Sequence, residues 1–88
     1  MSIIYVTQSD IDNGVIGDPL FCPIARAMRR TGYHDATVED DAIYYRDEDS
    51  GEIVRRWSNY HMRDFVVEFD RGDTVAPFSF DIEELERW

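Results

Sequence analysis

Residues 36–57 hold three short β-rich segments separated by connections of only a few residues, which narrows the folds open to this chain more than any other feature. The segments are 36–40 (ATVED), 42–47 (AIYYRD) and 53–57 (IVRRW). Asp40 and Asp41 mark a tight first connection, and Ser50 with Gly51 is typical of a turn. The pattern predicts an antiparallel three-stranded meander.

A segment on each side of this meander has the periodicity of an amphipathic helix. The first helix is predicted over 23–31, with a possible earlier start at residue 19. Pro is favoured at the first helical position and Gly just past the last, and the segment has Pro19, Pro23 and Gly32 at these places. Its expected buried face is Phe21, Ile24, Ala25 and Met28. The second is 60–70, with Ser58 or Asn59 as its cap and Gly72 as its terminator. Its expected buried face is Met62, Phe65, Val66 and Phe69.

The flanking segments complete the expected fold. Two further strands are predicted, at residues 2–7 and 74–82, and Pro77 makes the second an edge strand or one that starts late. One or two helical turns are expected after the first strand, with Thr7 or Ser9 as the N-cap. An 88-residue chain with 43% hydrophobic residues is expected to form one domain over residues 1–88. We expect an α+β fold with an antiparallel sheet of four or five strands and two main helices packed on one face. The other face would be free to carry charge.

Charge is the most unusual property of the composition. Nineteen acids against nine basic residues give a formal net charge of −10. Residues 35–52 carry eight acids and one arginine, residues 53–63 carry Arg55, Arg56 and Arg63, and residues 64–86 carry eight acids and one arginine. Two acidic blocks thus flank a basic segment. Such a surface repels nucleic acid and anionic membranes and attracts basic partners, so direct nucleic-acid binding is not expected.

The sequence offers little support for catalysis, metal binding or a cofactor. Cys22 lies where a helix N-terminus would lower a thiol pKa, but nothing brings His34 or His61 near it as a base. One Cys and two distant His lack the spacing of a zinc site, and "DEDSGE" lacks the full calcium-loop pattern. We expect a protein that is not an enzyme and carries no metal or cofactor. A nucleophilic Cys22 stays as an alternative.

No apolar run approaches the ~20 residues of a membrane span, and Met1 leads into "SIIYVT" without a basic signal-like region. A single cysteine fits a reducing compartment. We therefore expect a soluble protein, monomeric and cytoplasmic.

The acids themselves are the candidate site. In a strand, residues i and i+2 lie roughly 7 Å apart on one face, and on a helix i and i+4 lie about 6 Å apart. Asp47 with Asp49, or Asp64 with Glu68, would then approach the spacing of phosphates along a nucleic-acid strand. Any acidic strand or helix produces these intervals, so a solvated surface, as in a salt-adapted host, is the competing interpretation. The primary candidates are Asp35, Glu39, Asp40, Asp41, Asp47, Glu48, Asp49 and Glu52, and the secondary candidates are Asp64, Glu68, Asp70 and Asp73.

Aromatic side chains next to the acids favour a protein partner. They are Tyr44, Tyr45, Trp57 and Tyr60. Interfaces draw much of their affinity from Tyr, Trp and Arg, whereas surface charges mainly set association rate and selectivity. Because adjacent strand residues face opposite sides, one of Tyr44 and Tyr45 should be buried, and the other requires a separate explanation.

The segment "IYVTQSDIDNGVIGDPLFCPIARAMRR" resembles the N-terminal signature of small phage and prophage proteins. These have V-T-Q-x-D-I-x-x-G, then Asp and C-P-I-A-x-A, a β-meander and an F-D-x-G-x-x-x-P-F-x-F ending, which here is "FDRGDTVAPFSF". The similarity runs from Val6 to Phe80. Most such proteins have no assigned function, and the chain most resembles anti-CRISPR inhibitors of the type I-C system in Pseudomonas.

The resemblance implies a small α+β phage inhibitor acting in the infected bacterial host. Its negative face would occupy the DNA-binding region of the type I-C effector complex (Cascade), on the large subunit. The shared V-T-Q and C-P-I-A motifs look structural and do not locate the inhibitory surface. The alternative is a small acidic interaction module that binds another basic host protein or a virion protein.

Overall fold

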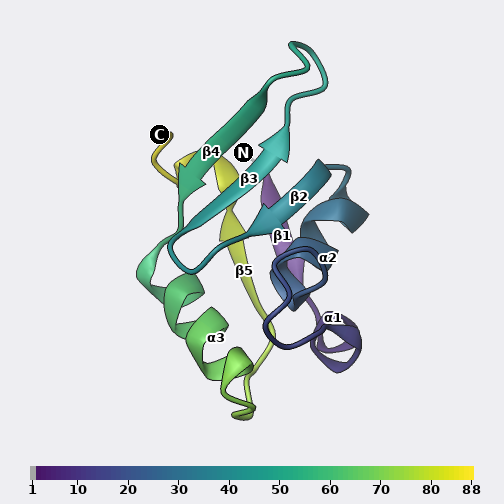
Figure 1. Ribbon diagram of the computed structural model, residues 1–88, viewed down its shortest axis with the longest axis vertical. Helices are drawn as coiled ribbons and strands as arrows, with labels where there is room; N and C mark the ends of the chain where they lie inside the picture. Colours follow the sequence, from purple (N-terminus) through teal and green to yellow (C-terminus); the bar gives the residue numbers. More distant parts are fainter. Residues whose placement is uncertain (1) are drawn as a thin grey trace.

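The computed structural model describes residues 2–88. Its elements are β1 (Ile3–Val6), α1 (Gln8–Asn13), α2 (Pro23–Thr31), β2 (His34–Val38), β3 (Ala42–Arg46), β4 (Ile53–Trp57), α3 (Tyr60–Asp70), β5 (Phe78–Asp81) and the 3₁₀ turn η1 (Ile82–Glu84), and Figure 1 shows their arrangement. The mixture of helices with antiparallel strands confirms the α+β class.

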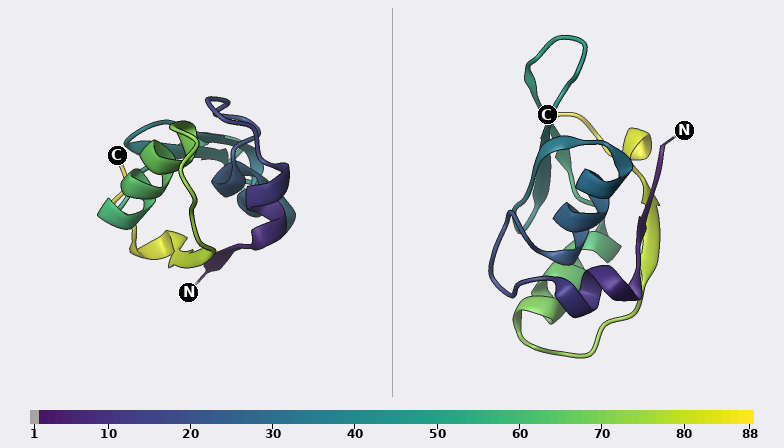
Figure 2. Two further views of the ribbon diagram at one scale, coloured as in Figure 1. Left: turned by 90° about the horizontal axis from the view of Figure 1, so that it is seen from below. Right: turned by 90° about the vertical axis from the view of Figure 1, so that its right-hand side faces the viewer.

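The strands form two sheets, and the expected single sheet is wrong. β2, β3 and β4 form the antiparallel meander, whereas β1 pairs with β5 alone. Figure 2 shows the two sheets on opposite sides of the core, with α2 at one flank and α3 at the other, both between the two sheets. α2 packs against both β2 and β1 and thereby joins the sheets.

Local signals explain where the helices begin and end. Thr7 and Asp10 form a capping box at the start of α1. Pro23 opens α2, and Gly32 ends it in the left-handed region with φ 112°. Asn59 caps α3 by accepting a hydrogen bond from the Met62 amide. Both main helices therefore have the predicted bounds.

The strands depart more from expectation. β2 begins at His34, two residues before the predicted start, and its pairing with β3 is irregular between His34 and Thr37. Glu39–Asp41 form a turn, closed by a bond from the Glu39 amide to the Ala42 carbonyl oxygen. β5 starts after Pro77, which has no amide hydrogen to donate to a strand partner.

The core lies between the two sheets. Its largest fully buried hydrophobic side chains come from every layer: Ile4, Val6, Ile24, Met28, Ile43, Met62 and Ile82. Phe21 was expected on the buried face of α2, but it precedes the helix and is 50% exposed. Within residues 2–88, no helix is long and apolar enough to cross a bilayer.

Candidate partner-binding surface

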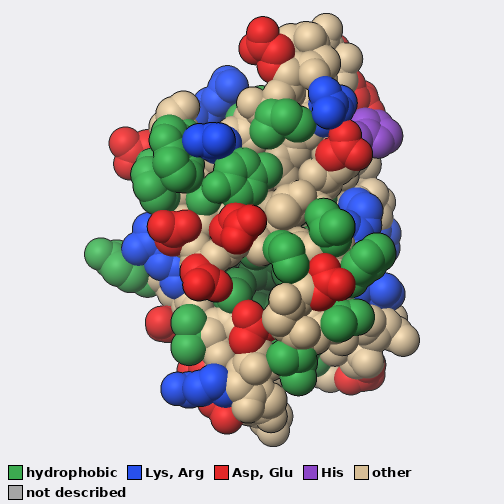
Figure 3. Space-filling model, in the orientation of Figure 1, with side chains coloured by type: hydrophobic (Ala, Val, Ile, Leu, Met, Phe, Trp, Pro, Cys, Tyr) green, Lys and Arg blue, Asp and Glu red, His purple; other side chains and the backbone are tan. Residues whose placement is uncertain are grey.

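The β2–β3 turn brings acids together with two other segments of the chain. Glu39 and Asp40 line a shallow depression of about 100 Å³ together with Asp18, from the α1–α2 connection, and Asp70, from the end of α3. We call these four residues the acidic ring. Figure 3 shows acidic side chains gathered around a hollow in the middle of this face. Glu39, Asp40 and Asp70 were predicted from the sequence, whereas Asp18, which has no acidic neighbour along the chain, was not.

Hydrogen bonds hold the three segments of the ring in place. The Val38 amide donates to the Pro19 carbonyl oxygen (2.9 Å), which attaches the α1–α2 connection to β2. The Gly17 amide donates to Asp70 Oδ1 (3.0 Å), which attaches it to α3. The depression is also lined by the apolar residues Cys22, Val38 and Val66. The fold therefore fixes the relative positions of the three segments that carry the acidic ring.

Asp41 lies in the same turn, with an exposed side chain. Its carbonyl oxygen accepts from the Ser58 amide at 2.9 Å, so the turn is also tied to the end of β4.

The remaining acids of the first block lie at the opposite end of the three-stranded sheet. Asp47, Glu48, Asp49 and Glu52 belong to the β3–β4 loop, which projects at the top of Figure 1. β3 has five residues, so the loop is roughly 17 Å from the β2–β3 turn. The Asp49 amide donates to Asp47 Oδ1 within a turn, so the strand spacing expected for this pair is wrong. The eight acids do not form one row.

Two acids near this loop have cationic or titratable partners. Arg46 Nε donates to Asp35 Oδ2 at 2.8 Å, and Asp35 adopts a positive φ of 55°. His34 Nε2 lies 2.7 Å from Glu48 Oε1. The charge of Arg46 reduces the negative field at this end of the sheet.

The acids of α3 divide between its two flanks. Asp64 and Glu68, four residues apart, line a second depression beside His61 and Val75, whereas Asp70 joins the acidic ring. A helix turns 100° per residue, so positions 64 and 70 project about 120° apart around its axis. Asp73 follows the helix and is paired with Arg71 at 2.7 Å.

The basic segment does not neutralise the acidic ring. Arg55 stacks over Tyr44 and Trp88. Arg56 donates to the Tyr45 hydroxyl and to the Leu85 carbonyl oxygen. Among the described residues, no ion pair joins Arg55, Arg56 or Arg63 to a carboxylate.

The aromatic residues divide as the strand alternation requires. Tyr45 is buried and packs edge-on against Tyr33, with ring centroids 4.9 Å apart. Tyr44, on the outer face, packs near Trp88, which stacks on Trp57 at 4.2 Å. Backbone bonds from Trp57 to Glu86 and from Trp88 to Arg55 hold the C-terminal segment along β4. The aromatic rings on the outer face of the sheet thus pack the C-terminal segment against β4.

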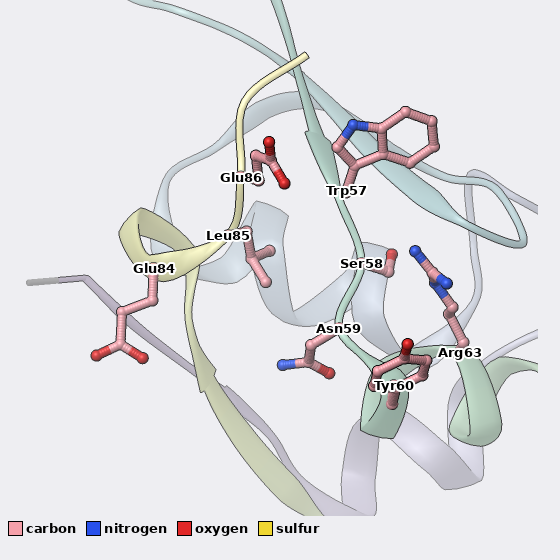
Figure 4. Close-up of a pocket in the computed structure, with 8 residues that line it drawn as sticks. All are labelled: Trp57, Ser58, Asn59, Tyr60, Arg63, Glu84, Leu85 and Glu86. Atoms are coloured by element: carbon pink, nitrogen blue, oxygen red, sulfur yellow. The ribbon is translucent and has the colours of Figure 1, made fainter.

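A larger cleft of about 550 Å³ lies where β4 meets α3. Its lining is Trp57, Ser58, Asn59, Tyr60, Arg63, Glu84, Leu85 and Glu86. Figure 4 shows the Ser58 and Arg63 side chains directed to the same side of the β4–α3 connection, whereas Glu84 points away. Ser58 Oγ and Arg63 Nε are buried and make no hydrogen bond within residues 2–88. One arginine and two glutamates give the cleft no single charge preference.

Cys22 lies beneath the acidic ring. Burial raises the pKa of its thiol and the charge of Asp70 acts in the same direction, while the Ala25 and Ile24 amides oppose them. His34 faces Glu48, and His61 packs against Phe78, so both imidazoles are engaged elsewhere. Within residues 2–88, no three His, Cys, Asp or Glu side chains are arranged to hold a metal ion.

Comparison of the chain with protein-family models, curated proteins and solved structures finds no match.

Proposed function

We propose that this chain is a phage-encoded anti-CRISPR protein that prevents the type I-C effector complex from binding target DNA. Its acidic surface would occupy a basic DNA-binding groove on the large subunit of that complex. The observation that carries the proposal is the acidic ring, in which acidic residues from three distant segments line one depression. The resemblance of residues 6–80 to type I-C inhibitors supplies the identity of the complex.

The charge arrangement supports competition with a duplex. Like-charged carboxylates held close together repel each other, and the core alone does not require them to converge. A groove lined with Lys and Arg attracts such a cluster through the same field that attracts phosphates. The attraction raises the association rate most at low ionic strength, because exposed charges are screened beyond about 8 Å at physiological salt.

The acidic ring is a better contact than the β3–β4 loop. The side chains of Glu39 and Asp40 are exposed and make no hydrogen bond within residues 2–88. Near the β3–β4 loop, by contrast, Asp35 is paired with Arg46 at 2.8 Å. A basic partner therefore meets less compensated charge at the ring.

A competition experiment tests the proposal. The purified protein and labelled double-stranded target are mixed with assembled type I-C effector at about 50 and 200 mM salt. We expect the protein to displace the duplex and to bind more weakly at the higher salt. If the duplex stays bound at saturating protein, the proposed function is wrong. If the protein instead recovers other basic proteins from host lysate, the interaction-module alternative replaces it.

A further inference from the structure

The α1–α2 connection exposes a group of large apolar side chains next to the acidic ring. Val15, Ile16, Leu20 and Phe21 are between 47% and 55% exposed, and all four lie within seven consecutive residues. Single exposed hydrophobic residues are ordinary on protein surfaces, whereas large exposed apolar patches mark interaction sites. We call these four residues the apolar knob.

Several contacts hold the connection that carries the knob. The Val15 amide donates to the Phe21 carbonyl oxygen at 2.9 Å, which closes the connection on itself. The Arg29 guanidinium lies 5.1 Å from the centroid of the Phe21 ring. At its base, Gly14 packs so closely on Pro23 that an added Cβ would lie 2.7 Å from the proline ring. A preorganised surface loses little entropy on binding, which favours its use as an anchor.

The knob and the ring share one surface. Gly17, Asp18 and Pro19, which lie between the two halves of the knob, also line the acidic depression. Figure 3 shows hydrophobic side chains beside the acidic ones around the hollow. An apolar centre with a charged margin is the usual anatomy of a protein–protein interface.

We propose that the apolar knob inserts into an apolar pocket beside the basic groove of the partner protein. This inference rests on the proposed function. It adds an apolar contact with the partner protein that a DNA duplex in the same groove would not make. The occupant is a protein, because the adjacent carboxylates repel both nucleic acid and an anionic membrane. The two parts of the surface have separate kinetic roles: the ring sets the association rate, and the knob slows dissociation.

Matched substitutions test these roles. Ile16→Thr changes the knob, and Ile53→Thr makes the same change at a residue on β4 with nearly the same exposure, 50% against 55%. Binding to assembled type I-C effector is followed in real time at two salt concentrations. We expect Ile16→Thr to raise the dissociation rate about tenfold, as for partial loss of an apolar anchor, and to leave the association rate within about twofold. Ile53→Thr should match the wild type.

The possible outcomes separate this inference from the proposed function. If the wild type binds and the Ile16→Thr variant dissociates at the wild-type rate while remaining folded by circular dichroism, the inference is wrong and the proposed function stands. If the wild type does not bind the effector, both are wrong. If light scattering shows a wild-type dimer that Ile16→Thr converts to a monomer, the knob is a contact between copies and the inference is overturned.

Discussion

Arg30 of α2 donates through Nη1 to the buried carboxylate of Asp10 in α1, and through Nη2 to the Tyr5 carbonyl oxygen in β1 at 2.6 Å. One guanidinium thereby joins three elements at the edge of the two-stranded sheet. Asp10 is only 1% exposed and also accepts from the Thr7 amide at 2.9 Å. The sequence did not predict this structural role for Arg30.

Replacing Arg30 by Ala should lower the free energy of unfolding by about 1–3 kcal/mol, because buried Asp10 would lose its hydrogen-bonded arginine and keep only Arg26, whose Nε lies 3.9 Å from Asp10 Oδ1. This loss of stability is smaller than the loss expected on breaking a fully buried ion pair, because the Arg30 side chain is 48% exposed. Urea unfolding measures the change. Arg87→Ala, which removes an exposed arginine with no side-chain bond within residues 2–88, is the control and should change stability by less than about 0.5 kcal/mol.

The same pair gives a pH dependence. Burial raises the pKa of Asp10, but the hydrogen bonds from Arg30 and Thr7 and the charge of Arg30 outweigh it, and the net pKa is lowered. A lowered folded-state pKa contributes stability that is present above the unfolded value of about 3.9 and is lost as pH falls through the folded value. Thermal unfolding from pH 6 to pH 2 should show this loss. A loss equally steep in Asp10→Asn would assign it to other carboxyls.

Reversing two charges of the acidic ring should weaken effector binding. Glu39→Lys with Asp40→Lys is expected to slow association about tenfold or more at low salt and to flatten the salt dependence. The matched control is Asp49→Lys with Glu52→Lys, which makes the same change in net charge in the β3–β4 loop. Surface plasmon resonance measures both. A larger effect in the control variant would place the contact at the loop.

The C-terminal aromatic stack should stabilise the fold. Trp88→Ala removes the contacts of this ring with Trp57 and Tyr44, so we expect a loss of about 1 kcal/mol or more and a change in near-ultraviolet circular dichroism. Tyr60→Ala removes an aromatic ring that is 82% exposed and should change stability much less. Equal losses in the two variants would show that the stack contributes nothing specific.

Replacing Cys22 by Ser should leave inhibition of the effector unchanged. The residue precedes α2 in an extended conformation and makes no side-chain cap, and a serine hydroxyl there can accept from the first helical amides. Stability should therefore change by about 1 kcal/mol or less. Loss of inhibition in a variant with wild-type unfolding would support the catalytic alternative for this thiol.

The elements that depend on neighbours in the chain could be predicted from the sequence. α2 and α3 have the predicted bounds because proline, glycine, asparagine and the apolar period act within a turn or two of the helix. The meander followed from its short connections. These signals need no knowledge of distant residues.

Where those elements and their charges meet could be seen only in the folded protein. β1 pairs with β5 across more than seventy residues, and this pairing separates the strands into two sheets. The acidic ring unites Asp18 with Asp70, and the first acidic block divides between the two ends of β3, which strand spacing did not reveal. The physical reason is that contacts between distant segments depend on how the whole core packs, whereas charge along the sequence records only which residues are neighbours in the chain.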